Sequence, residues 1–142
     1  LSVAGSATCS FSPDGNWLVT GSAEEYRFWE VGAWQAGLAI PRDRAGDMPG
    51  DMAFTPDGRM LALLRGRNTG VTLVSFPEGR ELASLDTGRP LAFSPDGGQL
   101  LTTGESSRGL QLWDLRLIRQ QLAALHLNWD SPAQSLISTR QP

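Results

Sequence analysis

Apolar and polar residues alternate along several short segments of the chain, and this alternation predicts β-strands with one face turned toward a core. Three of these segments are 26–31, 71–76 and 110–115. Further strands are expected at 35–40 and 81–85, shortly after the first two segments. The pattern therefore favours an all-β fold.

A ten-residue motif precedes each of the three alternating segments. Its copies start at Cys9, Met52 and Leu91 and align without gaps. They share the order apolar, small, Phe, Ser/Thr, Pro, Asp, Gly, two variable positions and Leu. Proline presets a φ of about −65°, aspartate can bond its own backbone, and glycine accepts a positive φ. Each copy therefore predicts a tight turn between two antiparallel strands.

The spacing of the motif sets the size of the repeating unit. Its phenylalanines, Phe11, Phe54 and Phe93, are 43 and then 39 residues apart. A period of roughly 40 to 45 residues is typical of a unit of four short strands. The sequence thus predicts a domain over 1–115 made of three four-stranded antiparallel blades, as in an incomplete β-propeller ring. The three expected blades span about 7–40, 48–86 and 88–115.

Two strand endings connect this pattern to a known family. The segments Phe28-Trp29-Glu30-Val31 and Leu112-Trp113-Asp114-Leu115 resemble the Trp-Asp ending of WD40 repeats. The resemblance covers about residues 7–115 and implies a β-propeller that acts as a non-catalytic protein-interaction scaffold. The middle copy departs from it with Val74-Ser75. No copy has the family's Gly-His pair, so its Asp-His-Ser/Thr-Trp hydrogen-bond network cannot form in the usual way, and we expect apolar packing to hold the blades.

Three blades are fewer than the roughly four to eight of a closed propeller. We therefore expect the chain to be the C-terminal portion of a larger, bacterial WD40 protein. Open blade faces and unpaired strand edges invite association. The expected partner is a second copy, with blade three of each copy packed against blade one of the other in a six-blade ring. The alternative is completion by other chains.

The segment that follows the last blade changes period. Ile118, Leu122, Leu125 and Trp129 recur at spacings of four, three and four, which predicts an amphipathic helix over about 116–127. Residues 116–130 are expected to cap blade three, or alternatively to dock on a partner, and a disordered tail is expected over 131–142. This ending also resembles those of large bacterial WD40 proteins, some fused to Ser/Thr kinase domains, so a sensor or regulatory domain of such a protein is a second interpretation.

Charge and composition exclude several classes of catalytic site and of binding partner. All twelve basic residues are arginines and the net charge is −3. The absence of lysine excludes the lysine of a P-loop or a kinase and any Schiff base. Scattered arginines argue against nucleic-acid binding, and no apolar run approaches the roughly 20 residues of a membrane span. The single cysteine, Cys9, is compatible with the reducing cytoplasm, where we expect the protein.

Few residues are candidates for catalysis or metal binding. The only histidine is His126, on the predicted helix, with no Gly-x-Ser-x-Gly elbow or His/Cys cluster beside it. Asp43, Asp47 and Asp51 are four residues apart, unlike calcium ligands of an EF-hand, and are expected to be solvated loop carboxylates. We therefore predict no catalytic activity, no cofactor and no metal. The rival hypothesis is an enzymatic or metal-binding propeller with carboxylates around its channel.

The resemblance implies a protein partner on the face that carries the loops 41–50, 66–70, 86–89 and 105–109. Arginines in or near these loops could contact acidic or phosphorylated partners. The candidates are Arg42, Arg44, Arg67 and Arg89. Trp34, expected in the connection between blades, is a further candidate because tryptophan is enriched at interfaces.

Overall fold

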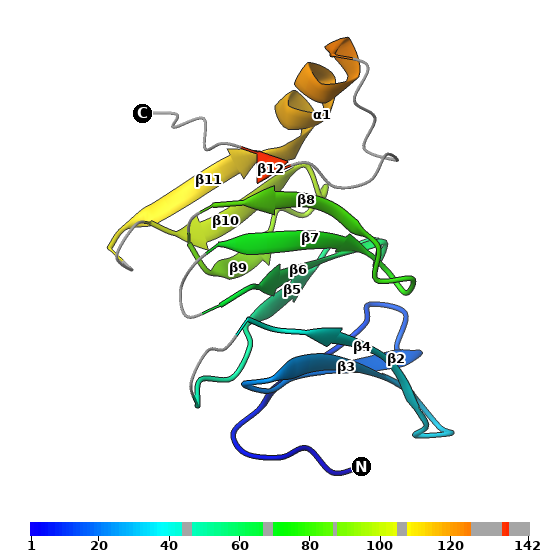
Figure 1. Ribbon diagram of the computed structural model, residues 1–142. Helices are drawn as coiled ribbons and strands as arrows, with labels where there is room; N and C mark the ends of the chain where they lie inside the picture. The colour runs from blue at the N-terminus through cyan, green and yellow to red at the C-terminus, as the bar shows by residue number, and fades with distance from the viewer. Residues whose placement is uncertain (44–46, 67–69, 87, 105–107, 126–134, 137–142) are drawn as a thin grey trace.

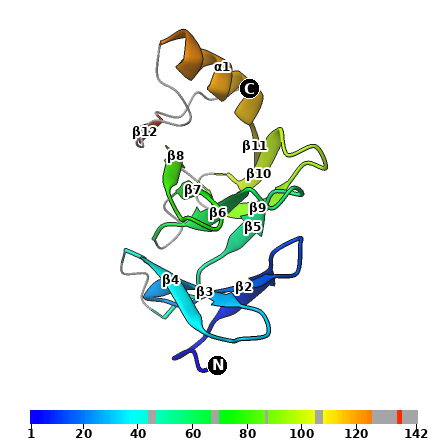
Figure 2. The same ribbon diagram turned by 90° about the vertical axis from the view of Figure 1, so that its right-hand side faces the viewer.

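Three β-sheets stacked one on the next form the protein (Figures 1 and 2). The computed structural model describes residues 1–43, 47–66, 70–86, 88–104, 108–125 and 135–136. The first sheet contains β1 (Thr8–Phe11), β2 (Trp17–Gly21), β3 (Glu25–Glu30) and β4 (Ala36–Pro41). The second contains β5 (Met52–Phe54), β6 (Met60–Leu64), β7 (Val71–Ser75) and β8 (Glu81–Leu85). The third contains β9 (Pro90–Phe93), β10 (Gln99–Thr103) and β11 (Leu110–Asp114).

These sheets confirm the predicted fold class, which is an incomplete set of antiparallel propeller blades with one short helix. We call them blade one, blade two and blade three. Consecutive strands are neighbours in each blade, and every one of these pairs is antiparallel. Blade three has three strands among the described residues, and its last strand leads directly into α1 (Leu115–Ala124).

Helix α1 begins where the Trp-Asp segment ends. Oδ1 of Asp114 accepts hydrogen bonds from the backbone N–H groups of Arg116 (3.0 Å) and Leu117 (3.1 Å). An aspartate in this position satisfies donors that the first helical turn leaves without partners. Leu115 is buried and Ile118 packs on the core between blades two and three, while Leu125 is exposed. The last strand of blade three thus ends at a residue that caps the helix.

A short strand from the C-terminal segment joins blade two. β12 (Ser135–Leu136) pairs in parallel with β8, with Ser135 opposite Ser84 and Leu136 opposite Leu85. It lies within 131–142, which the sequence predicts to be a disordered tail; the other residues of that range lie outside the described part of the chain. The apolar pattern does not predict this pairing, because two residues are too few to show a period.

The three Ser/Thr-Pro-Asp-Gly turns have one geometry. In the first, the Ser12 hydroxyl donates to Oδ1 of Asp14, which also accepts from the backbone N–H of Asn16 (3.0 Å). Gly15 has a φ of 74° and donates to the Ser12 carbonyl (2.9 Å). Thr55 with Asp57 and Ser94 with Asp96 repeat the side-chain bonds (2.7 and 2.6 Å). The predicted turns are therefore confirmed, with a positive φ that glycine adopts without strain.

These hydrogen bonds make the turns sensitive to acid. The Ser12 hydroxyl lowers the pKa of Asp14, and the Thr55 hydroxyl does the same for Asp57. Hydrogen bonds from Ser94 and from the backbone of Gly98, with a contribution from Arg116, lower the pKa of Asp96 to about 2. Each folded-state pKa lies below the unfolded value of about 3.9. For Asp96 the stabilisation is therefore complete above about pH 4 and is lost as the pH falls toward 2, and for Asp14 and Asp57 it is likewise present above the unfolded pKa and lost on acidification.

An Asp96→Asn variant tests this acid sensitivity. We expect the melting temperature of the wild type to fall more steeply between pH 4 and pH 2 than that of the variant, because the variant has no carboxylate to protonate at this turn. Thermal melts followed by circular dichroism in a pH series measure the difference. Parallel pH profiles for the two proteins would contradict the assignment.

Two hydrophobic clusters join the blades. One cluster joins blade one to blade two. It contains Val19, Tyr26 and Phe28 of blade one and apolar side chains of blade two that include Leu61 and Phe76. A second cluster joins blade two to blade three, and its members are Ala53, Ala62, Val71, Leu73, Leu82, Ala83, Leu85, Leu100, Trp113 and Leu115. No residue belongs to both clusters. The core thus consists of two separate inter-blade layers.

A tryptophan–threonine hydrogen bond recurs in the first and third blades. Nε1 of Trp29 donates to Oγ1 of Thr20 (3.0 Å), and Nε1 of Trp113 donates to Oγ1 of Thr102 (3.1 Å). In blade two the matching positions hold Leu63 and Val74, both buried. The Trp–Thr part of that hydrogen-bond network is therefore present in two blades, and apolar contact replaces it in the middle blade, as expected for blades held by packing.

Candidate protein-interaction face

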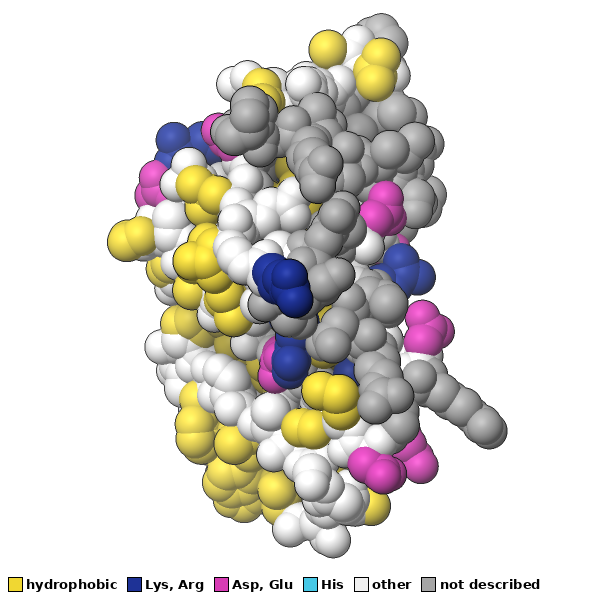
Figure 3. Space-filling model, turned by 90° about the vertical axis from the view of Figure 1, so that its left-hand side faces the viewer, with side chains coloured by type: hydrophobic (Ala, Val, Ile, Leu, Met, Phe, Trp, Pro, Cys, Tyr) yellow, Lys and Arg dark blue, Asp and Glu magenta, His cyan; other side chains and the backbone are white. Residues whose placement is uncertain are grey.

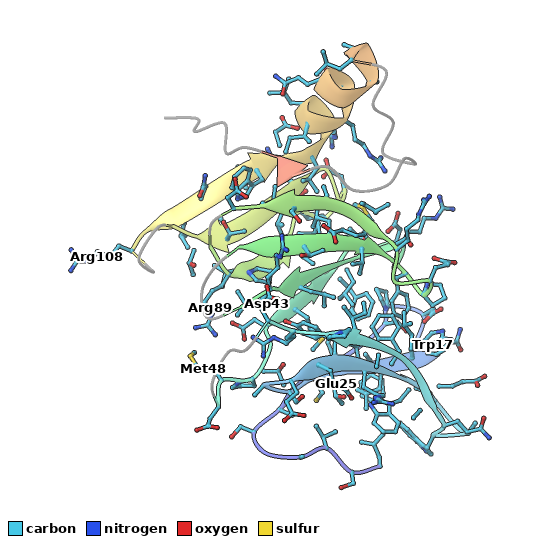
Figure 4. The ribbon with its side chains drawn as sticks, viewed as in Figure 1. Trp17, Glu25, Asp43, Met48, Arg89 and Arg108 are labelled. Atoms are coloured by element: carbon cyan, nitrogen blue, oxygen red, sulfur yellow. The ribbon has the colours of Figure 1, made fainter. Side chains whose placement is uncertain are left out.

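The connections between strands lie at two opposite edges of the blades. The Ser/Thr-Pro-Asp-Gly turns mark one of them, which we call the turn edge. The loop edge carries the connections 22–24, 42–51, 65–70, 86–89 and 104–109, apart from the parts of them outside the described residues. In Figure 4, Asp43, Met48, Arg89 and Arg108 lie along the loop edge, and Trp17 lies toward the other. The loops in which the sequence predicts a docking face thus belong to one edge.

Tyr26 is at the centre of the polar contacts near this edge. Its side chain is 1% exposed, and its hydroxyl lies 2.9 Å from the carbonyl oxygen of Asp51 and 2.8 Å from that of Leu64. Burial raises the pKa of Tyr26, so the hydroxyl keeps its proton and donates it to one of the two carbonyls at a time. The hydrogen bond links blade one to blade two.

Arg42 covers the ring of Tyr26. Its guanidinium carbon lies 5.5 Å from the ring centre, and the residue is 8% exposed. Nη1 donates to the carbonyls of Ser22 (2.5 Å) and Met48 (2.9 Å), and Nη2 makes a longer contact of 3.5 Å with that of Gly66. These three carbonyls belong to a turn of blade one, the connection between blades, and a turn of blade two. Arg42 therefore ties the first two blades together at the loop edge.

Arg89 lies on the other side of Asp51. Its Nε donates to Oδ2 of Asp51 (2.6 Å), and Nη2 forms an ion pair with the same oxygen. Both side chains are about one quarter exposed, at 26% and 28%. Asp51, which the sequence places among solvated loop carboxylates, thus has a fixed arginine partner.

Tyr26, Arg42, Asp51 and Arg89 form a continuous set of contacts, which we call the loop-edge cluster. The two arginines and the aspartate all act electrostatically on Tyr26. Two of the four predicted arginines, Arg42 and Arg89, are therefore brought together here, the first buried and the second partly exposed. Figure 3 faces the loop edge and shows arginine and acidic side chains interspersed on it.

The remaining predicted site residues are not part of this cluster. Arg44 and Arg67 lie outside the described residues. Trp34 is 45% exposed in the turn between β3 and β4, with a φ of 52°. The six residues of β4 separate it from Arg42 by about 20 Å, because a strand rises about 3.3 Å per residue. Trp34 is therefore at the turn edge.

Three residues at the loop edge were not singled out for partner contact by the sequence. Arg108 is exposed at the turn between β10 and β11 and extends away from the sheets in Figure 4. Tyr26 and Asp51 acquire their roles from partners 25 or more residues away in the chain. In the sequence, Tyr26 could have been identified as buried from its inward position in an alternating strand. Arg108 could have been identified from its position in a predicted loop of the docking face.

Within the described ranges, no three His, Cys, Asp or Glu side chains lie close enough to hold a metal ion. His126 is outside these ranges. No helix of the described chain has the length and apolar character needed to cross a membrane.

Comparison with known proteins detects one WD40 repeat and a propeller fold. Residues 4–29 match the family "WD domain, G-beta repeat". Similar solved structures include U3-55K (TM-score 0.67, 23% identity), which covers 82% of this chain and 38% of that one. The β-propeller domain of Cps50 (Swd1) from Myceliophteria thermophila has a TM-score of 0.65 and 14% identity, with coverage of 81% and 37%. Hydrazine synthase from Kuenenia stuttgartiensis has a TM-score of 0.61 and 20% identity, with coverage of 77% and 32%.

The chain therefore spans about a third of the length of these structures. No curated protein sequence matches it. At such identities the similarity establishes the fold and leaves the activity open.

Proposed function

We propose that the chain is part of a larger bacterial WD40 protein and acts as a non-catalytic scaffold that binds a protein partner through the loop edge. The matched repeat and the three stacked blades support the scaffold role. A cytoplasmic location is proposed on the single cysteine, Cys9, which is a free thiol.

The loop-edge cluster is the observation that carries this proposal. It gives the edge a fixed arrangement, because Arg42 and Tyr26 join blade one to blade two while Arg89 reaches Asp51 from the connection to blade three. Fixed side chains lose little conformational freedom when a ligand binds. The partly exposed Arg89 and the exposed Arg108 offer guanidinium donors at this edge. Such donors fit an acidic or phosphorylated peptide segment, because guanidinium groups pair with carboxylate and phosphate in a bidentate manner.

Binding of labelled acidic and phosphorylated peptides, measured by fluorescence anisotropy, tests the proposal. We expect the double variant Arg89→Gln/Arg108→Gln to bind a selected peptide at least about tenfold more weakly, since each lost charged hydrogen bond costs about 1.5–3 kcal/mol. The matched control is Arg116→Gln, because Arg116 is an exposed arginine near the turn edge whose ion pair is with Asp96. Equal affinities in the wild type and the double variant, or an equal loss in the control, would rule out the loop edge as the binding surface.

A further inference from the structure

A pocket lies between blades one and two, on the side of their outer strands. Its volume is about 170 Å³, and it is lined by residues of β3 and β4 from one blade and of β6, β7 and β8 from the other. Ile40, Leu63 and Val74 form its apolar part, next to the cluster that joins the two blades. Arg42 and Asp43, the latter labelled in Figure 4, line its end at the loop edge. Both blades have all four strands in the structure, so the pocket is a feature of their stacking.

The guanidinium of Arg42 has one edge without a close acceptor. Nη1 donates to the carbonyls of Ser22 and Met48. Nε is buried and has no hydrogen-bond partner in the part of the chain that the structure describes. The neighbouring Nη2 makes only the 3.5 Å contact with the Gly66 carbonyl, which is longer than an ordinary hydrogen bond. Nε and Nη2 together form an edge with which arginine can bind a carboxylate through two parallel hydrogen bonds.

This edge is turned toward the pocket. Nη2 faces Gly66 in the β6–β7 turn, and the two residues before Gly66, Leu64 and Arg65, line the pocket. Nε is shielded from solvent, so a ligand reaches it by displacing the Gly66 contact. Because that contact is long and therefore weak, a closer acceptor can replace it. A carboxylate has two oxygens and would serve both nitrogens, whereas the carbonyl serves one.

The buried charge of Arg42 favours an anion in this pocket. None of the ion pairs among the described residues includes Arg42, and its acceptors are neutral carbonyls. A buried charge without a partner of opposite sign is unfavourable. Arg65, Asp43 and Glu81 also line the pocket, but all three are exposed, so water and salt screen their charges. The buried Arg42 therefore has the largest effect on the potential inside the pocket.

We propose that the pocket binds a small monocarboxylate with a short apolar chain. The carboxylate pairs with the Nε–Nη2 edge of Arg42, and the chain lies against Ile40, Leu63 and Val74. Since a cavity of roughly 150 Å³ holds a benzene-sized molecule, the pocket has room for about six or seven non-hydrogen atoms, the size of pentanoate. This site goes beyond the scaffold function proposed above and does not depend on which peptide the loop edge binds.

Titration of the isotope-labelled protein with pentanoate, followed by nuclear magnetic resonance, tests the site. We expect the Nε–H proton signal of Arg42 to move downfield as this group gains an acceptor, with a dissociation constant of about 1 mM or tighter. Pentanamide has the same size but no charge, and we expect it to bind at least about tenfold more weakly. An Nε–H signal that does not move, or equal affinities for pentanoate and pentanamide, would overturn the proposal.

A substitution that fills the pocket tests the position of the ligand. Thr72 is half-buried in β7 and lines the pocket, so the ring in Thr72→Phe would occupy the space of the apolar chain. We expect this variant to bind pentanoate at least about tenfold more weakly than the wild type. The matched control is Gln99→Phe, which adds the same ring at a half-buried position of β10 outside the pocket. Its affinity for pentanoate is expected to stay within about twofold of the wild type.

Circular dichroism checks that both variants fold. If Thr72→Phe does not fold, the comparison of pentanoate with pentanamide on the wild type still decides the matter. Full binding by a folded Thr72→Phe protein, or an equal loss in the control, would contradict the assignment of the site. The peptide and pentanoate titrations use different ligands and different variants, so either proposal can fail while the other holds.

Discussion

Replacing Phe76 with alanine is expected to lower the free energy of unfolding by about 3–5 kcal/mol, the usual cost of removing a buried phenylalanine. Phe76 is 8% exposed and lies between blades one and two. Its ring centre is 5.1 Å from that of Phe28, 4.9 Å from that of Phe54 and 6.1 Å from that of Trp17. The contacts with Phe54 and Trp17 are edge-to-face, an arrangement that adds to the energy of burial.

Urea denaturation followed by circular dichroism measures this effect. The control is Trp34→Ala, because Trp34 is also aromatic but is 45% exposed in a turn. We expect the control to change stability by less than about 1 kcal/mol. A Phe76→Ala protein as stable as the control would show that blades one and two do not depend on this aromatic contact.

Replacing Arg42 with alanine is the second change with a large expected effect, a loss of about 3 kcal/mol. The guanidinium satisfies two backbone carbonyls at 2.5 and 2.9 Å and covers the ring of Tyr26. Hydrogen bonds from a charged donor contribute about 1.5–3 kcal/mol, and a partly desolvated cation–π contact about 1 kcal/mol more. Because the residue is buried, water cannot readily replace these contacts.

Two further variants separate the causes. Arg42→Lys keeps the charge, but a single ammonium group cannot reach carbonyls in three different segments, so we expect it to lose most of the same stability. Arg65→Ala removes an exposed arginine whose Nη1 donates to the Ser84 hydroxyl, and we expect a loss below about 1 kcal/mol. If the lysine variant has the same free energy of unfolding as the wild type, the positive charge of Arg42 stabilises the fold and the geometry of its guanidinium group does not.

The repeated elements were the easiest part of the fold to predict. The three turns could be predicted because Pro, Asp and Gly each have a local role there, and Gly15 has the positive φ that this role requires. The strand expected at 81–85 corresponds to β8 (Glu81–Leu85), and the one expected at 35–40 lies one residue before β4 (Ala36–Pro41). The helix begins at Leu115 rather than Arg116, because Asp114 already serves as its cap.

The loop edge was harder to predict, since its contacts join residues far apart in the sequence. The sequence identifies Arg42 as a charged loop residue. Its hydrogen-bond acceptors are backbone carbonyl groups, which cannot be predicted from a pattern of side chains. The pairing of Arg89 with Asp51 spans 38 residues. Only the stacking of the blades brings these groups together, so the sequence could place the loops of this edge but not the contacts between them.

The separation of the core into two layers also bears on how the protein unfolds. In stacked repeats each unit depends on its nearest neighbours, so stability can be lost unit by unit. Because the two apolar clusters share no member, breaking the layer between blades two and three leaves that between blades one and two intact. We therefore expect backbone amides of β10 and β11 to exchange with solvent independently of those of β2 and β3, as in two cooperative units rather than one.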